Sequence, residues 1–195
     1  MARKLAVVAD RTNAAPTTIL ETTPRSYLTE DEVEALLKAA GCERDRCMIL
    51  VAYIHGLRVS ELIGLQWRQL DLKRGRIRVE RLKGSENSEQ PLTGREIRLL
   101  RAVQRSLPVG CRFVFMTRLG APMTRQAFGK MLREAGVRAG LGGVHPHLLR
   151  HACGYKLAND GHDTRALAAY LGHANLNNVA RYTKMSSRRF DGWFR

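Results

Sequence analysis

Positions 145–151, HPHLLRH, bring three of the six histidines of this chain together with one arginine. If a helix begins at Pro146, His147 and Arg150 lie three residues apart and share one face of its first turn. The unpaired N–H groups and the partial positive charge of a helix N-terminus favour a bound phosphate beside these two side chains. A helix that merely begins with polar residues gives the same pattern, and for H-x-x-R taken alone that is the commoner explanation.

The same seven residues also allow a metal site. His147 and His151 have the i, i+4 spacing of paired ligands in helical zinc sites, and His145 lies close to them in sequence. However, no Asp or Glu lies among them, and Arg150 would hold a fixed positive charge beside the ion. A metal site is therefore the weaker interpretation, and we expect neither a metal ion nor a cofactor.

Charged residues outside this cluster, in an apolar helix and in a turn, are further candidates for a functional role. In GLRVSELIGL, Arg58 opens a short helix and Glu61 follows three residues later. Charges in such an apolar frame are costly unless paired, so Arg58 and Glu61 form either a structural ion pair or a supported functional arginine. Lys83 lies at the edge of a turn rich in Gly and Ser, from which its ammonium could reach a ligand, although a solvated turn lysine is the commoner case.

The segment ALAAYLGHANLNNVARYTK places His173 directly after a glycine and Tyr182 nine residues later, on the next expected helix. A buried tyrosine with one hydrogen bond is the usual state of such a residue. The segment also has the size and the glycine placement of a helix-turn-helix, so a DNA-binding role is a further interpretation.

The elements that must position these residues follow from hydrophobic spacing, caps and turns. Residues 1–26 are predicted to be an extended arm, and residues 27–195 one domain that is mainly helical with a small antiparallel β-sheet (α+β). Capping boxes are expected at Thr29–Glu32 and Thr93–Glu96, and Thr124 is expected to cap a third helix. The expected helices lie within 28–41 (ended by Gly41), 43–56, 58–70, 93–108, 124–140, 146–159, 163–171 and 176–182. A β-hairpin is expected within 71–93, where Ile77 and Val79 alternate with arginines. A short strand is expected at 113–116.

Composition indicates a polyanionic partner. The chain of 195 residues has 33 Lys and Arg against 18 Asp and Glu, a formal net charge of +15, and a pI near 10.5. Phosphate groups neutralised by such a surface release counterions, which favours nucleic acid, although a ribosome-associated or merely basic protein has the same balance. The four cysteines form no C-x-x-C pair and are expected to be unpaired core thiols, and no signal or membrane-spanning stretch is found. We therefore expect a soluble cytoplasmic protein.

Taken in order, these motifs resemble those of the tyrosine recombinase (phage integrase) family. The matching features are GLRVSEL, a lysine in a β-turn, HPHLLRH, LGHANL and a tyrosine nine residues beyond His173. The resemblance covers roughly residues 27–195 and implies the catalytic domain fold of that family. Within the family, RLK, HPHLLRHACGYKLAN and DTRALAAYLGH are most similar to short bacterial recombinases that invert promoter segments in fimbrial phase variation.

The resemblance implies a metal-free cleavage of DNA in which Tyr182 attacks phosphorus and forms a 3′-phosphotyrosyl link. A tyrosine is a poor nucleophile at neutral pH, because its pKa is about 10, unless cations surround it. The catalytic residues that the resemblance implies are Arg58 and Arg150 on the non-bridging oxygens, Lys83 as the acid for the 5′ oxygen, His147 and His173 on the phosphate, and Tyr182 as nucleophile. It further implies that Glu61 holds Arg58 and that His151 has a supporting role.

Double-stranded DNA is the partner that the resemblance implies, bound by a homotetramer on two sites with possible accessory DNA-bending proteins. The arm is too short to be the separate N-terminal domain of many members, and the terminal RFDGWFR could pack on a neighbour or on its own domain. Three other functions compete: a non-catalytic helix-turn-helix-like regulator, a topoisomerase of type IB that relaxes DNA, and a metal-dependent nuclease. The outcome of recombination, whether inversion, excision or integration, does not follow from the sequence.

Overall fold

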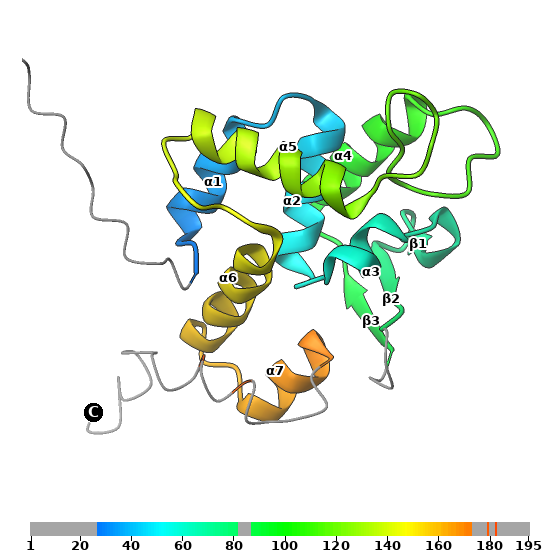
Figure 1. The fold of residues 1–195 in the computed structure, drawn as a ribbon. Helices are drawn as coiled ribbons and strands as arrows, with labels where there is room; N and C mark the ends of the chain where they lie inside the picture. The colour runs from blue at the N-terminus through cyan, green and yellow to red at the C-terminus, as the bar shows by residue number, and fades with distance from the viewer. Residues whose placement is uncertain (1–26, 82–86, 173–178, 180–181, 183–195) are drawn as a thin grey trace, which may run out of the picture.

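The computed structural model of this protein describes residues 27–81, 87–172, 179 and 182. There the elements follow in the order α1 (Glu30–Lys38), α2 (Glu43–Ile54), α3 (Val59–Ile63), a 3-10 turn η1 (Trp67–Gln69), β1 (Leu70–Asp71), β2 (Arg76–Val79), β3 (Ser88–Pro91), α4 (Gly94–Arg105), α5 (Arg125–Arg138), α6 (Pro146–Asn159) and α7 (Thr164–Leu171). The predicted fold class, mainly helical with a small antiparallel sheet, is confirmed (Figure 1). The predicted arm over residues 1–26, the terminal RFDGWFR and most of the helix predicted within 176–182 lie outside the described residues.

Helices begin where the sequence supplies capping side chains. The hydroxyls of Thr29 and Thr93 each accept a hydrogen bond from the backbone N–H three residues on, and Glu32 and Glu96 complete both capping boxes. The hydroxyl of Thr124 likewise accepts from a backbone N–H in the first turn of α5. These starts are as predicted, because a cap depends only on residues that are near one another in sequence.

The end of α1 differs from the prediction. We expected Gly41 to end this helix, but the last helical residue is Lys38 and Ala39 is the C-cap, in right-handed helical conformation. The carbonyl oxygen of Ala39 accepts a hydrogen bond of 2.8 Å from Nε of Arg138 at the end of α5. A side chain from a distant helix therefore caps α1, so no left-handed glycine is required.

Helix α2 is the centre of the core. It contacts α1, α3, α4 and α6, and Figure 1 shows it enclosed among these elements. Residues 47–52 on α2 are almost wholly buried, as the apolar run in the sequence predicted. His55 and Gly56 directly follow α2, and their backbone carbonyls point to the region where α3, α6 and α7 meet.

The sheet is an antiparallel array in the order β1-β2-β3. Ile77 of β2 pairs with Gln90 of β3, and Val79 pairs with Ser88. Ile77 and Val79 are buried, whereas the arginines between them are exposed, so the predicted alternation is confirmed. A side chain that continues this alternation past Val79 must also point inward.

The strand predicted at 113–116 is wrong. Phe113 and Met116 make only isolated bridges, to Gln66 and to Pro122. Val114 and Phe115 between them are fully buried. The apolar run therefore marks a segment of loop that is buried in the core, and within the part of the chain that the structure describes no strand is paired along it.

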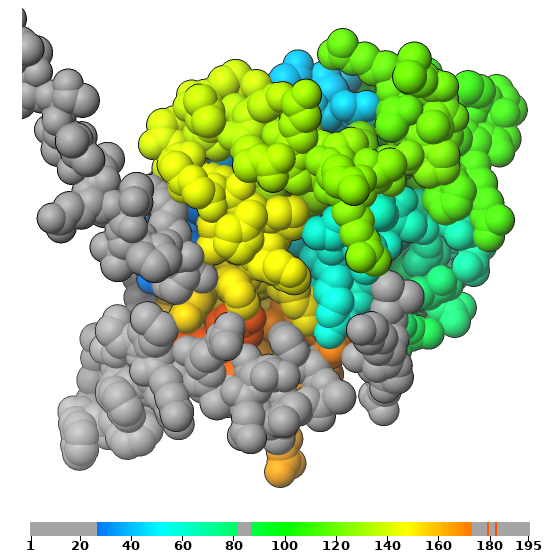
Figure 2. Space-filling view, in the orientation of Figure 1, coloured from blue at the N-terminus to red at the C-terminus, as the bar shows by residue number. Residues whose placement is uncertain are grey.

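A second, smaller apolar cluster joins α6 to α7 and includes Tyr155, Leu171, Val179 and Tyr182. In Figure 2 the yellow α6 lies beside the cyan segment that leads from α2 into α3, and the orange α7 is visible beneath them. No helix within the described residues is long and apolar enough to cross a bilayer.

All four cysteines are free thiols. Cys47 and Cys153 are buried, as predicted for core thiols, whereas Cys42 and Cys111 are half-buried.

Candidate active site

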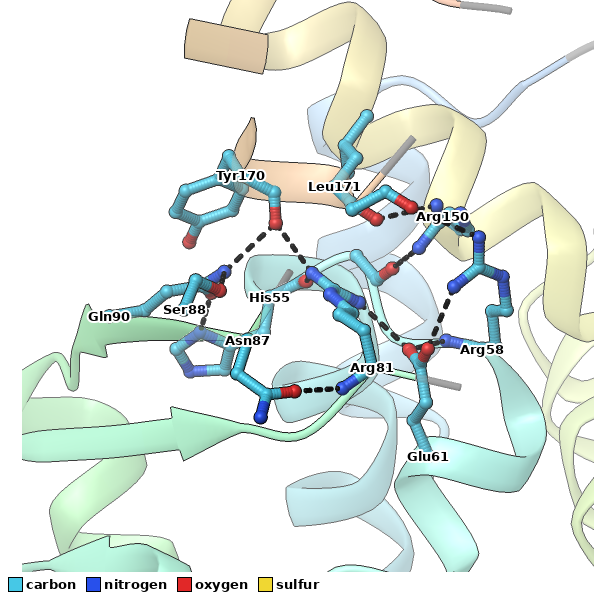
Figure 3. Close-up of polar contacts among 12 residues, drawn as sticks. His55, Arg58, Glu61, Arg81, Asn87, Ser88, Gln90, Arg150, Tyr170 and Leu171 are labelled. Atoms are coloured by element: carbon cyan, nitrogen blue, oxygen red, sulfur yellow. Dashed lines mark hydrogen bonds and ion pairs between the residues drawn. The ribbon is translucent and has the colours of Figure 1, made fainter. Parts of the chain in front are cut away.

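Charged side chains from separate parts of the chain meet at the carbonyl end of α7 (Figure 3). Arg58 and Glu61 come from the start of α3, Arg81 follows β2, and Arg150 lies on α6. Helix α7 ends at Gly172, whose φ of 63° is left-handed and favours glycine. The last carbonyls of a helix have no partner within it and form its negative end, so they attract cations.

Arg58 and Glu61 are tied together by two hydrogen bonds. Arg58 is the N-cap of α3, and its backbone N–H donates to Oε2 of Glu61 at 2.8 Å while its Nη1 donates to Oε1 at 2.8 Å. Its Nη2 donates to the carbonyl oxygen of Gly172 at 3.2 Å. The side chain of Arg58 is 32 % exposed and that of Glu61 only 2 %. Burial raises the pKa of Glu61, but hydrogen bonds from Arg58, the charge of Arg81 and its hydrogen bond bring that pKa below its ordinary value.

Arg150 lies deeper, with 5 % of its surface exposed. Its Nη1 donates to the carbonyl of Gly56, and its Nη2 donates to the carbonyl of Leu171 at 2.7 Å. Burial lowers the pKa of this guanidinium to about 10, and the positive charges of Arg58 and Arg81 act in the same direction. The sequence-predicted pair Arg58 and Arg150 is thus brought to one place from opposite halves of the chain.

Tyr182 lies against the same helix that carries Arg150. Its hydroxyl is 2.9 Å from Nδ1 of His151, and its ring is 1 % exposed. The ring packs edge-on against Tyr155, with centroids 5.1 Å apart, and lies close over Gly154. The expected nucleophile is therefore held against α6, near enough to Arg150 to interact with its charge, and the side chain of His151 contacts its hydroxyl.

The histidines of the opening cluster separate in space. Helix α6 begins at Pro146, as predicted, but His147 in its first turn is exposed whereas Arg150 is buried. His145 is the exposed N-cap, and its pKa is lowered by partial burial and by His147, whose ring is 6.3 Å away. Among the described residues, no group of three or more His, Cys, Asp or Glu could hold a metal ion.

Two predicted residues, Lys83 and His173, lie outside the described residues. Their neighbours Arg81 and Gly172 are part of the site. Arg81 was missed by the sequence reasoning, although a signal for it exists. It continues the inward alternation of Ile77 and Val79, so a strand pattern extended by one step would have placed an arginine inside the protein.

Comparison with known families matches residues 26–189 to the model described as the phage integrase family. The chain belongs to the phage integrase family. A relative within it is the type 1 fimbriae regulatory protein FimE of Escherichia coli K12, 42 % identical over 181 residues, which cover 86 % of this chain and 90 % of FimE. FimB of the same strain is 40 % identical over 177 residues, and these cover 88 % of FimB. The resemblance inferred from the motifs is thus confirmed.

Solved structures of phage integrase family members have the same fold. The XerA recombinase superposes with a TM-score of 0.76 and 26 % identity, over 85 % of this chain and 62 % of XerA. The XerH site-specific recombinase bound to its difH substrate gives a TM-score of 0.70 and 25 % identity, over 82 % of this chain and 50 % of XerH. The chain therefore spans about half to three fifths of these structures. The predicted catalytic domain fold is confirmed.

Proposed function

We propose that this protein cleaves DNA through Tyr182 and rejoins it in a new arrangement. As a member of the phage integrase family it is a site-specific recombinase, and double-stranded DNA is its partner. The observation that supports Tyr182 as the nucleophile is its place against α6. The hydroxyl lies 2.9 Å from His151, the residue next to Arg150, whose guanidinium lies beside that of Arg58.

The chemistry uses the cations to stabilise charge that develops on the phosphate. Arg58 and Arg150 bind the non-bridging oxygens, since guanidinium groups remain charged and pair with two oxygens at once. Oη of Tyr182 attacks phosphorus as its proton leaves, and the bond to the 5′ oxygen breaks. Lys83 gives that oxygen a proton, which leaves a 5′ hydroxyl and a 3′-phosphotyrosyl link.

Histidines assist these proton transfers. His151 orients the hydroxyl of Tyr182, because its Nδ1 is within hydrogen-bond distance. His147 and His173 hydrogen-bond the phosphate. The phosphotyrosyl bond retains the energy of the phosphodiester, so attack by the 5′ hydroxyl of another strand completes the exchange without ATP.

The biological outcome that we propose is inversion of a promoter segment that controls fimbrial genes. Its support is the similarity to FimE and FimB, which are named as regulators of type 1 fimbriae and which this chain matches over 88–90 % of their lengths. We further propose that the protein acts as a homotetramer on two DNA sites in the nucleoid, with accessory DNA-bending proteins.

The test is capture of the covalent intermediate. Cells that carry the gene and its chromosomal neighbourhood are lysed in denaturant, and DNA linked to the protein is sequenced to give the site. A duplex with that site, nicked so that the cleaved end diffuses away, should then trap a protein–DNA adduct that Tyr182→Phe abolishes. Tyr155→Phe is the control, because this neighbouring ring contacts Tyr182 but is not the proposed nucleophile.

Other outcomes distinguish the competing functions. An adduct formed equally by Tyr182→Phe, or none with the sequenced site, would refute the role of Tyr182. Relaxation of plasmids that lack the site would indicate a topoisomerase. Cleavage that stops when a chelator is added would indicate a metal-dependent nuclease.

A further inference from the structure

Arg81 is a charged residue of the site that has no access to solvent. Its side chain is 0 % exposed, although it lies only two residues before the turn lysine. Its Nη1 donates to Oε2 of Glu61 at 2.8 Å, and its Nη2 lies 2.5 Å from the carbonyl oxygen of Tyr170 and 3.2 Å from that of His55 (Figure 3). Its backbone N–H donates to Oδ1 of Asn87 at 2.9 Å. This guanidinium is enclosed by its partners, so the role considered for it passes through the groups that it touches.

Three successive carbonyls at the end of α7 each accept from a different arginine. Tyr170 accepts from Arg81, Leu171 accepts from Arg150, and Gly172 accepts from Arg58. Arg81 is thus one of three guanidiniums that dock on the negative end of the same helix. It differs from the other two because it also joins the base of the β2–β3 hairpin to α7.

The fit of Arg81 beneath α7 is close. A Cβ at Gly172 would lie 2.8 Å from Cγ and Cδ of Arg81 and 2.9 Å from Nε, which is too near for any side chain. Nε of Arg81 has no hydrogen-bond partner within the described part of the chain. A buried guanidinium with an unpaired N–H is unfavourable for folding alone, so the presence of Arg81 here calls for a reason besides stability.

Glu61 connects Arg81 to Arg58. One oxygen of its carboxylate accepts from Nη1 of Arg58, and the other accepts from Nη1 of Arg81 and from the backbone N–H of Arg58. The carboxylate is therefore fixed from two sides. With Arg81 present, the trio carries a net positive charge, whereas Glu61 and Arg58 alone would form a neutral pair.

We propose that Arg81 is a positioning residue, which orients Arg58 through Glu61 and keeps the local charge positive where the scissile phosphate binds. The inference rests on the proposed function of Arg58. It predicts that loss of Arg81 slows cleavage strongly when the scissile phosphate carries its full negative charge and less when part of that charge is removed, although Arg81 does not itself touch DNA. A merely structural arginine would have no such effect.

The test compares Arg81→Met and Arg81→Lys with the control variants Arg74→Met and Arg74→Lys. Arg74 lies in the turn between β1 and β2, is 86 % exposed, and serves as the matched control for charge. Adduct formation is measured in a single turnover at saturating nicked duplex. A second duplex has a methylphosphonate at the scissile position, in which a methyl group replaces one charged non-bridging oxygen. Less positive charge from the protein is then needed to stabilise the transition state.

We expect Arg81→Met to form adduct about 10²-fold more slowly on the phosphodiester, the size of effect for a mispositioned charge-stabilising group, with DNA affinity nearly unchanged. On the methylphosphonate its deficit relative to the unaltered protein should shrink to a few-fold. Arg81→Lys keeps the charge but not the planar guanidinium, so its deficit should be intermediate, and it provides a folded variant if Arg81→Met is unstable. Both Arg74 variants should react at the rate of the unaltered protein.

Equal deficits on the two substrates would assign Arg81 a structural role only, and an unchanged rate on the phosphodiester would exclude any role; either result overturns the inference. These outcomes leave the proposed function intact, because the unaltered protein still forms the adduct. If the unaltered protein forms no adduct on either duplex, the proposed function fails, and the inference fails with it.

Discussion

Gly154 lets the ring of Tyr182 lie close against α6, the helix that carries Arg150, and replacing it by Ala is a direct test of that arrangement. A Cβ at this position would lie 2.8 Å from two carbons of the Tyr182 ring and 2.9 Å from a third. The ring must therefore retreat by about 0.7 Å to reach the ~3.5 Å separation of carbon atoms in contact. That movement also lengthens the 2.9 Å contact between the hydroxyl and His151.

Two effects on stability oppose each other. Alanine inside a helix is favoured over glycine by about 0.5–1 kcal/mol, whereas overpacking costs about 1–3 kcal/mol. The free energy of unfolding should therefore fall by roughly 0–2.5 kcal/mol, which lowers the melting temperature by at most about 10 °C. The effect on cleavage is larger, because a displacement of about 1 Å of a reacting group can lower the rate about 10²-fold.

Two other glycines give matched controls for Gly154→Ala. A Cβ added at Gly129 on α5 would meet only the flexible end of Arg133, at 3.7 Å, so Gly129→Ala should be neutral or stabilising. Gly136 on α5 would place a Cβ 2.9 Å from Val144, so Gly136→Ala has the same kind of steric conflict away from Tyr182.

Thermal unfolding and single-turnover adduct formation are measured for all three variants. Only Gly154→Ala should cleave slowly per folded molecule. If Gly154→Ala cleaves as fast as Gly129→Ala while it melts as low as Gly136→Ala, Tyr182 does not react from the position described.

Further predictions concern Glu61 and the thiols. Glu61→Gln leaves the guanidiniums around it uncompensated and should lower the free energy of unfolding at pH 7 by about 3 kcal/mol, measured by thermal denaturation. The pKa of Glu61 in the folded protein lies below its ordinary value of 4.5, so the stabilisation by its charge is complete above pH 4.5 and is lost as the pH falls through the folded pKa. Glu61→Gln should lack this loss of stability in acid. Equal profiles of stability against pH for the two proteins would contradict the reasoning. Burial raises the pKa of Cys153 to about 12, so iodoacetamide at pH 8 should label Cys42 and Cys111 in the native protein but not Cys153, as read by peptide mass; equal labelling would show that α6 opens.

Local features of the fold were predictable from sequence, and features that depend on a distant partner were not. The caps at Thr29, Thr93 and Thr124 are complete within one turn, so these helix starts agree with the prediction. The end of α1 depends on Arg138, a residue from another helix, and was therefore placed wrongly at Gly41. The predicted strand at 113–116 failed for a related reason, since burial of an apolar run does not supply the neighbouring strand that a sheet requires.

The candidate active site likewise combines residues that the sequence motifs predicted with an arrangement that they did not predict. Arg58, Arg150 and Tyr182 were found through the order of motifs that resemble a family, because no property of H-x-x-R or of a single tyrosine is specific enough. Their convergence depends on where α7 ends in space, since the carbonyls of residues 171 and 172 accept hydrogen bonds from Arg150 and Arg58. Where a helix ends relative to residues a hundred positions earlier is a tertiary property, and sequence spacing contains no direct signal for it.

The end of α7 also explains how the free protein tolerates three guanidiniums at one place. Like charges brought together repel, and Glu61 places its carboxylate among Arg58, Arg81 and Arg150. The carbonyl oxygens of residues 170–172 place partial negative charge beside the three guanidiniums, one oxygen for each, as phosphate oxygens would. A guanidinium has five N–H donors, so one or two bonds to carbonyls orient it without using its whole capacity. We therefore expect α7 to hold Arg58 and Arg150 in place before DNA binds, and a deletion that shortens α7 by one turn should weaken phosphate binding even where every arginine remains.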